Sequence, residues 1–85
     1  MKELIDYVNE KNRWNAMFKG ATLLDLNNAA DRQRIAESID SALSPENLSC
    51  DGELPRSQVR ARYQRLSKAA EQLMKLDPTV QIYEL

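Results

Sequence analysis

A run of basic residues is the strongest candidate for a binding surface in this chain. Residues 56–68 contain no acid and carry Arg56, Arg60, Arg62, Arg65 and Lys68. On a helix, Arg56 and Arg60 share one side, while Arg62 and Arg65 share another. Such cations bind phosphates or acidic side chains, but an ordinary solvated helix face has the same composition. The residue types therefore leave both interpretations open.

The segment 44–55 holds the second group of reactive residue types, with Glu46, Asp51 and Glu53 around the only cysteine. A nucleophilic thiolate needs an electropositive neighbour, whereas Asp51 and Glu53 would oppose ionisation of Cys50. A calcium loop needs more oxygen ligands than these two carboxylates supply. We interpret Cys50 as a packing residue and the three acids as part of an interaction loop.

The sequence lacks the groups on which most enzyme sites depend. There is no histidine, so the usual general base and the commonest metal ligand are missing. One cysteine cannot build a zinc site, and two isolated glycines do not form a phosphate-binding loop. We expect a protein that is not an enzyme and has no metal or cofactor.

Large aromatic side chains gather near position 14. Trp14, Met17 and Phe18 are close together, and Tyr7 lies a helical stride away. Aromatic residues are enriched at binding hot spots, but they are also the natural core of a small bundle. We expect these residues to lie in the core.

Composition narrows the classes of partner. The 85 residues suit one domain, and the net charge is −1, from 12 basic and 13 acidic residues. No overall field would draw the chain to nucleic acid or to a membrane. The sequence has no apolar run of membrane-spanning length, and acids occupy the start where a signal peptide would be apolar. We expect a cytoplasmic protein with a reduced thiol.

The first predicted helix covers about residues 2–19. Leu4 and Val8 repeat at helical spacing, and Gly20 is a plausible stop. The polar stretch near Asn12 leaves open a division into two shorter helices.

The second predicted helix covers about residues 27–43. Asn27 or Asn28 is a good N-cap for it. Thr22 is a rival cap, which would carry the helix back through the leucines that follow it.

The rest of the chain reads as a loop, a helix and a tail. Two prolines and an Asp-Gly pair mark 44–55 as a long loop, in which Ser44-Pro45-Glu46 could begin a helical turn. Apolar residues at spacings of three and four predict a helix over 56–76. An extended tail, 77–85, is expected to pack across the helices.

These elements predict an all-α fold. Three amphipathic helices, or four if the loop contains a turn of helix, can bury one another only as a bundle. We expect the second and third long helices to form an antiparallel hairpin. The first would lie across it and contribute Trp14 and Phe18 to the core. Homo-oligomerisation would add burial to so small a bundle.

The second half of the chain carries a resemblance. Its residues are Leu43-Ser44-Pro45-Glu46-Asn47-Leu48-Ser49-Cys50-Asp51-Gly52-Glu53-Leu54-Pro55, then Arg62-Tyr63 and Leu76-Asp77-Pro78. This half resembles small proteins encoded by tailed bacteriophages. The resemblance implies a protein that binds and blocks a host or defence protein, and it assigns no functional residue.

Two hypotheses follow for the function. The first is a non-enzymatic helical protein that docks on another macromolecule and modulates it, such as a phage-type inhibitor of a host or defence protein. The alternative is a nucleic-acid-binding module that uses the basic face of helix 56–76. Steep loss of binding with added salt would indicate the phosphate contacts of the alternative.

Overall fold

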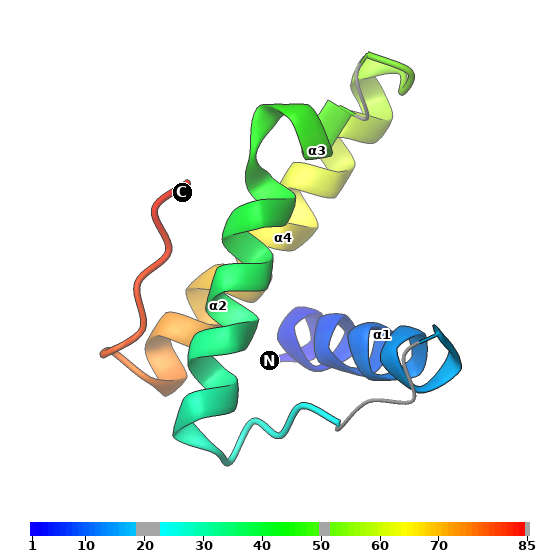
Figure 1. The fold of residues 1–85 in the computed structure, drawn as a ribbon. Coiled ribbons are helices and arrows are strands. Elements are labelled where there is room, and N and C mark those ends of the chain that lie inside the picture. Colours follow the sequence, from blue (N-terminus) through cyan, green and yellow to red (C-terminus); the bar gives the residue numbers. More distant parts are fainter. Residues whose placement is uncertain (19–22, 50–51, 85) are drawn as a thin grey trace.

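The structure, a computed structural model, describes residues 1–18, 23–49 and 52–84. Within these ranges the only regular secondary structure is helical: α1 (Lys2–Phe18), α2 (Ala29–Leu43), α3 (Pro45–Ser49) and α4 (Arg56–Leu76). Helices α2 and α4 run antiparallel, and α1 lies with its N-terminal end against this hairpin and extends away from it to one side (Figure 1). The predicted all-α bundle built on a helical hairpin is confirmed.

The first helix is continuous, so the predicted alternative of a break near Asn12 is wrong. Asn12 instead holds the segment that follows α1. Its side-chain amide donates to the carbonyl of Leu24 at 3.0 Å and accepts from the amide of Leu24 at 2.7 Å. The predicted stop at Gly20 lies outside the described residues.

The cap of α2 is Asn28, one of the two asparagines that the sequence proposed. Its side-chain oxygen accepts from two amides of the first helical turn, at 2.9 and 3.2 Å. Leu23, Leu24 and Leu26 are not helical, so the alternative start at Thr22 is wrong. Thr22 itself lies outside the described residues.

The connection between α2 and α4 contains the short helix α3. Pro45 opens it, as expected from the fixed backbone angle of proline. The side-chain Nδ2 of Asn47 donates to the carbonyl of Ser41 at 2.7 Å, which holds α3 against the end of α2. Leu48 packs on the core. Gly52 has a φ of 86°, a left-handed conformation that other residues rarely adopt.

The core lies where the three long helices meet. Its fully buried large side chains are Leu4, Ile35, Ile39 and Leu73. Each such side chain contributes about 1.5–3 kcal/mol through its removal from water. Around them pack Val8, Ala36, Leu43, Leu66, Ala69, Ala70 and Val80. Helix α1 therefore supplies buried residues from its first half only.

The prediction that Trp14 and Phe18 belong to the core is wrong. Their exposed fractions are 47% and 66%, and that of Met17 is 69%. The physical reason is the direction of α1. Its first half packs on the hairpin through Leu4 and Val8, and its second half extends beyond the hairpin (Figure 1).

Residues 77–84 form a C-terminal strap that returns beside α2 (Figure 1). At its start, the Asp77 carboxylate accepts from Arg32 Nε at 2.7 Å and from the amide of Thr79 at 3.0 Å. At its end, the Asp40 carboxylate accepts from the amides of Tyr83 and Glu84 at 2.8 Å each. Val80 is buried between these two anchors.

Candidate functional site

A groove of about 500 Å³ separates α1 from α4. One face of α1 lines one side of this groove: Glu3, Asp6, Tyr7, Glu10, Lys11 and Trp14. The other side comes from α2 and α4: Ala42, Arg62, Arg65 and Leu66. We call this surface the α1/α4 groove. Its two walls carry opposite charge, because three acids of α1 lie across from two arginines of α4.

The groove has this composition because of helical spacing. Glu3, Asp6 and Glu10 recur at intervals of three and four, so their side chains share a face of α1. The next face along holds Leu4 and Val8, which are buried. A helix that buries one row in this way must present the neighbouring row along the edge of the contact.

Polar contacts at the inner end of the groove fix α1 on the hairpin. The amide of Leu4 donates to Gln72 Oε1 at 3.0 Å, and Gln72 Nε2 donates to Glu3 Oε2 at 2.6 Å. The hydrogen bond from Gln72, a hydrogen bond from the backbone of Glu3 itself and the nearby Lys68 cation lower the pKa of Glu3. Glu3 therefore accepts a hydrogen bond across the contact and helps to tie α1 to α4.

Tyr7 makes the corresponding link to α2. Its hydroxyl lies 2.5 Å from the hydroxyl of Ser38. Burial raises the pKa of Tyr7, and the bond to Ser38 offsets part of that rise. Tyr7 thus remains protonated at neutral pH and forms part of the groove floor with Ala42 and Leu66.

The outer end of the groove is aromatic. The rings of Trp14 and Phe18 have centroids 5.4 Å apart and are tilted by 42°. Phe18 and its neighbour Met17 are mostly exposed, as given above, and Leu23 is 57% exposed. Trp14, Met17 and Phe18, which we call the α1 tip, are exposed apolar side chains at the end of α1, and Trp14 joins this tip to the groove. Clustered exposed apolar side chains of this kind are typical of interaction sites.

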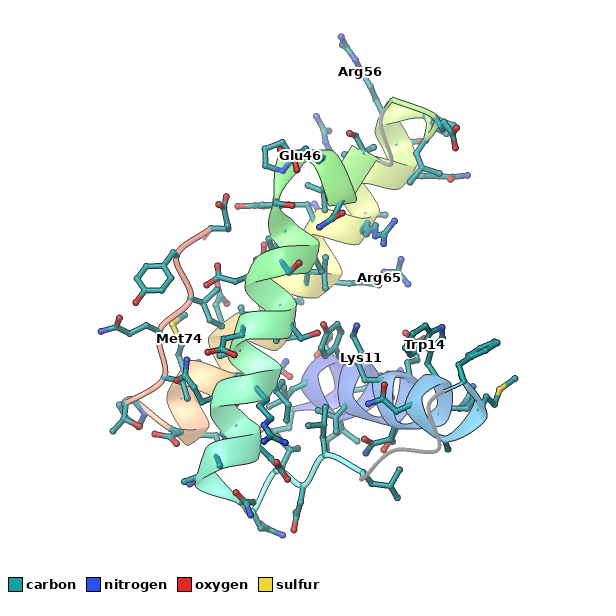
Figure 2. All side chains as sticks on the ribbon, in the orientation of Figure 1. Lys11, Trp14, Glu46, Arg56, Arg65 and Met74 are labelled. Carbon is teal, nitrogen blue, oxygen red and sulfur yellow. The ribbon has the colours of Figure 1, made fainter. Side chains whose placement is uncertain are left out.

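The basic residues predicted as one patch are divided by the structure. Arg62 and Arg65 line the α1/α4 groove, and Lys68 lies near Glu3. Arg56 projects from the far end of α4, away from α1 (Figure 2). Arg60 is exposed. The cations therefore do not form a single face, and Arg62 and Arg65 share their surroundings with acids.

Side chains from both helices enter the space of the groove. Figure 2 shows Arg65 extending from α4 toward the side on which Lys11 and Trp14 rise from α1. The side chains of Asp6, Glu10 and Arg65 form no hydrogen bond or ion pair with any described residue. Their charges are available to a binding partner.

A second hollow of about 670 Å³ continues the groove toward α3. Lys11, Ala42 and Arg62 line both hollows, which makes them one surface. Glu46, one of the three predicted loop acids, lines this second hollow. Glu53 is exposed, and Cys50 and Asp51 lie outside the described residues.

The sequence interpretation missed most of the groove. It singled out Arg62 and Arg65 but not the acids that face them, Glu3, Asp6 and Glu10. Their spacing along α1 was the available signal. It showed that they share a face, whereas only the packing of α1 on α4 shows what lies opposite.

In the described part of the chain, no three His, Cys, Asp or Glu residues are grouped closely enough to hold a metal ion. None of the helices in the described ranges has the length and hydropathy that a bilayer span needs. Comparison with protein-family models, curated proteins and solved structures finds no match to the chain. The function is therefore inferred from the α1/α4 groove and the α1 tip.

Proposed function

We propose that this chain is a non-enzymatic interaction protein that docks onto another protein through the α1/α4 groove and the α1 tip. The observation that carries the proposal is the exposure of Trp14, Met17 and Phe18 at the end of α1, where Trp14 also lines a groove with charged walls. An apolar centre with charged surroundings is the usual anatomy of a protein–protein interface.

Keeping the α1 tip in water costs free energy that a partner would recover. An aromatic side chain buries roughly 150–250 Å² when it is fully covered, and each Å² is worth about 25 cal/mol. A helix that ended near Asn12 would avoid this exposure. The extension of α1 past the core is accounted for by docking, and it contributes no buried side chain to the fold.

A protein fits this surface better than a nucleic acid does. The acids Glu3, Asp6 and Glu10 face Arg62 and Arg65 across the groove. A phosphate chain laid along the arginines would approach these carboxylates, and like charges in close contact oppose binding. A protein can present both signs of charge and satisfy both walls.

The identity and place of the partner are part of the proposal. The resemblance of the second half to small proteins of tailed bacteriophages supports a host or defence protein as the partner. It also supports the cytoplasm as the place where they meet. Docking would then modulate the partner by covering part of its surface.

Affinity capture from cell lysate tests the docking function, in parallel captures with and without nuclease. We expect the tagged chain to retain a protein that the double variant Trp14→Ser, Phe18→Ser loses. Truncating one hot-spot aromatic costs about 2 kcal/mol or more, which is roughly 30-fold in Kd. The matched control is Tyr83→Ser, because Tyr83 is an exposed aromatic on the C-terminal strap.

Two results would contradict the proposal. Retention of the same partner by the double variant would show that the α1 tip takes no part in docking. Binding that requires nucleic acid, and weakens steeply with salt, would favour the basic residues of α4 as a phosphate site. Circular dichroism of each variant checks that the helices remain formed.

A further inference from the structure

The walls of the α1/α4 groove restrict the form that an occupant can take. Both walls are helices, whose backbone amides and carbonyls are already paired within each helix. An extended strand laid between them would find no backbone edge to pair with. A helix needs no such edge, since its own backbone bonds are internal. The groove therefore suits recognition through side chains.

The dimensions of the groove agree with a helix. From Glu3 to Trp14 the wall of α1 runs for about 17 Å, or roughly three helical turns. Along this length the floor offers Tyr7, Leu66 and Ala42, and Trp14 closes the outer end. An apolar stripe with side chains at intervals of three and four would meet these residues in turn.

The charges of the groove specify the flanks of that helix. On the α1 side, Asp6 and Glu10 have no partner among the described residues. On the α4 side, Arg65 has none either, and Arg62 lies one turn away from it. An occupant must present cations to one wall and anions to the other. Lys11, at the junction with the second hollow, reduces the negative charge of the α1 wall without reversing it.

Building on the docking function proposed above, we infer that the α1/α4 groove binds an amphipathic helix of the partner protein. Its apolar stripe lies on Tyr7, Leu66 and Trp14. Basic residues on one flank face Asp6 and Glu10, and acidic residues on the other flank face Arg62 and Arg65. The bound helix completes a bundle with α1 and α4.

Three designed helical peptides test this inference, each about 20 residues long so that it is helical in isolation. All carry the same leucine stripe and no tryptophan. The first has lysines on one flank and glutamates on the other, the second has lysines on both, and the third has glutamates on both. Exchanging the two flanks is not a control, because a helix can lie in the groove in either direction.

Trp14 reports binding directly, because it is the only tryptophan in the chain. We expect a blue shift of its emission as a peptide covers the ring. The unmodified chain should bind the mixed-flank peptide at least roughly tenfold more tightly than the other two, because each of those places like charges against one wall.

Charge reversal should redirect this preference. Arg65→Glu should favour the lysine-flanked peptide, and Glu10→Lys on the opposite wall should favour the glutamate-flanked peptide. Arg56→Glu is the matched control, since Arg56 projects away from α1 on the same helix (Figure 2). It should leave the order of affinities unchanged. The two reversals act on different helices, so each checks the other should one variant fail to fold.

The inference is overturned if no peptide shifts the emission of Trp14. It is also overturned if the three peptides bind equally, or if neither charge reversal alters their order. If one of these results occurs while the unmodified chain still captures a protein from lysate through the α1 tip, only the helical form of the occupant is rejected. If the unmodified chain captures no protein from lysate, the docking function itself is rejected.

Discussion

Half-buried polar side chains reinforce the contacts that α1, the segment after it and the C-terminal strap make with the rest of the chain. Gln72 bonds to both the backbone and a side chain at the start of α1, and Asn12 clamps the backbone that follows. Asp40 and Asp77 anchor the two ends of the C-terminal strap. Each of these four side chains accepts a hydrogen bond from a backbone amide. An apolar replacement would leave that amide unpaired.

We expect the carboxyl group of Asp77 to make the free energy of unfolding depend on pH. The hydroxyl of Thr79, the Arg32 guanidinium and the Thr79 amide lower the pKa of Asp77 from 3.8 to about 2. Because this pKa is lower in the folded state, the unfolded chain binds the proton more readily. The stabilisation is present above pH 3.8 and is lost as the pH falls toward 2. Urea unfolding across this range measures the decline.

The variant Asp77→Asn tests the assignment of that decline to one group. It keeps the size of the side chain and removes the titrating carboxyl, so its curve of unfolding free energy against pH should be flatter than that of the unmodified chain. It should also start lower at neutral pH, because the ion pair with Arg32 is gone. A variant curve as steep as the original would assign the acid sensitivity to other carboxylates.

At the scale of elements, local signals located the ends of the helices. Proline before Arg56 and Asp77-Pro78 after Leu76 mark the limits of α4, and the structure places the helix between them. The asparagine before Ala29 similarly marks the start of α2. These signals are local, because a cap or a proline acts on the turn in which it lies.

The polar centre of α1 was harder to interpret. Asn12 has a modest helix propensity and stands among other polar residues, which left a break open as an alternative. The structure uses it instead as a partner for the backbone of Leu24, which follows α1 in the chain. This long-range use cannot be read from helical propensity.

Removing the clamp should therefore destabilise the chain. Asn12→Ala deletes two hydrogen bonds to the backbone of Leu24, and we expect a loss of about 1–3 kcal/mol in the free energy of unfolding. Chemical denaturation followed by circular dichroism measures it. Asn9→Ala is the matched control, since Asn9 is exposed on the same helix. Equal effects of the two substitutions would show that the clamp contributes nothing beyond helix propensity.

On the scale of the whole molecule, the sequence predicted the bundle and the packing of Tyr7 on the core, but it placed Trp14, Met17 and Phe18 wrongly. Helical periodicity shows which residues share a face of a helix. It does not show how much of that face a neighbouring helix covers. Leu4 and Val8 meet the hairpin, whereas Trp14 lies beyond it. The angle at which α1 leaves the hairpin decides this difference, and such crossing geometry depends on how whole helix surfaces fit together.

The same crossing creates the candidate site. Arg62 and Arg65 were recognisable as cations, but the acids of α1 become relevant only when the two helices face each other across a groove. The predicted patch also included Arg56, which lies at the far end of α4 (Figure 2). Charge along the sequence therefore identified candidate residues and not the surface to which they belong.

The central claim, that a protein docks on the α1/α4 groove and the α1 tip, is tested most directly by photo-crosslinking in cells. A photoreactive phenylalanine analogue replaces one residue at a time, at Trp14, Met17 and Arg65 on the proposed surface and at Arg56, Gln81 and Tyr83 elsewhere. The adducts are separated by mass before and after nuclease treatment. We predict a nuclease-resistant protein adduct at the first three positions and none at the other three. Adducts at Arg56, Gln81 or Tyr83 without any at Trp14 and Met17, or adducts that nuclease removes, would contradict the account.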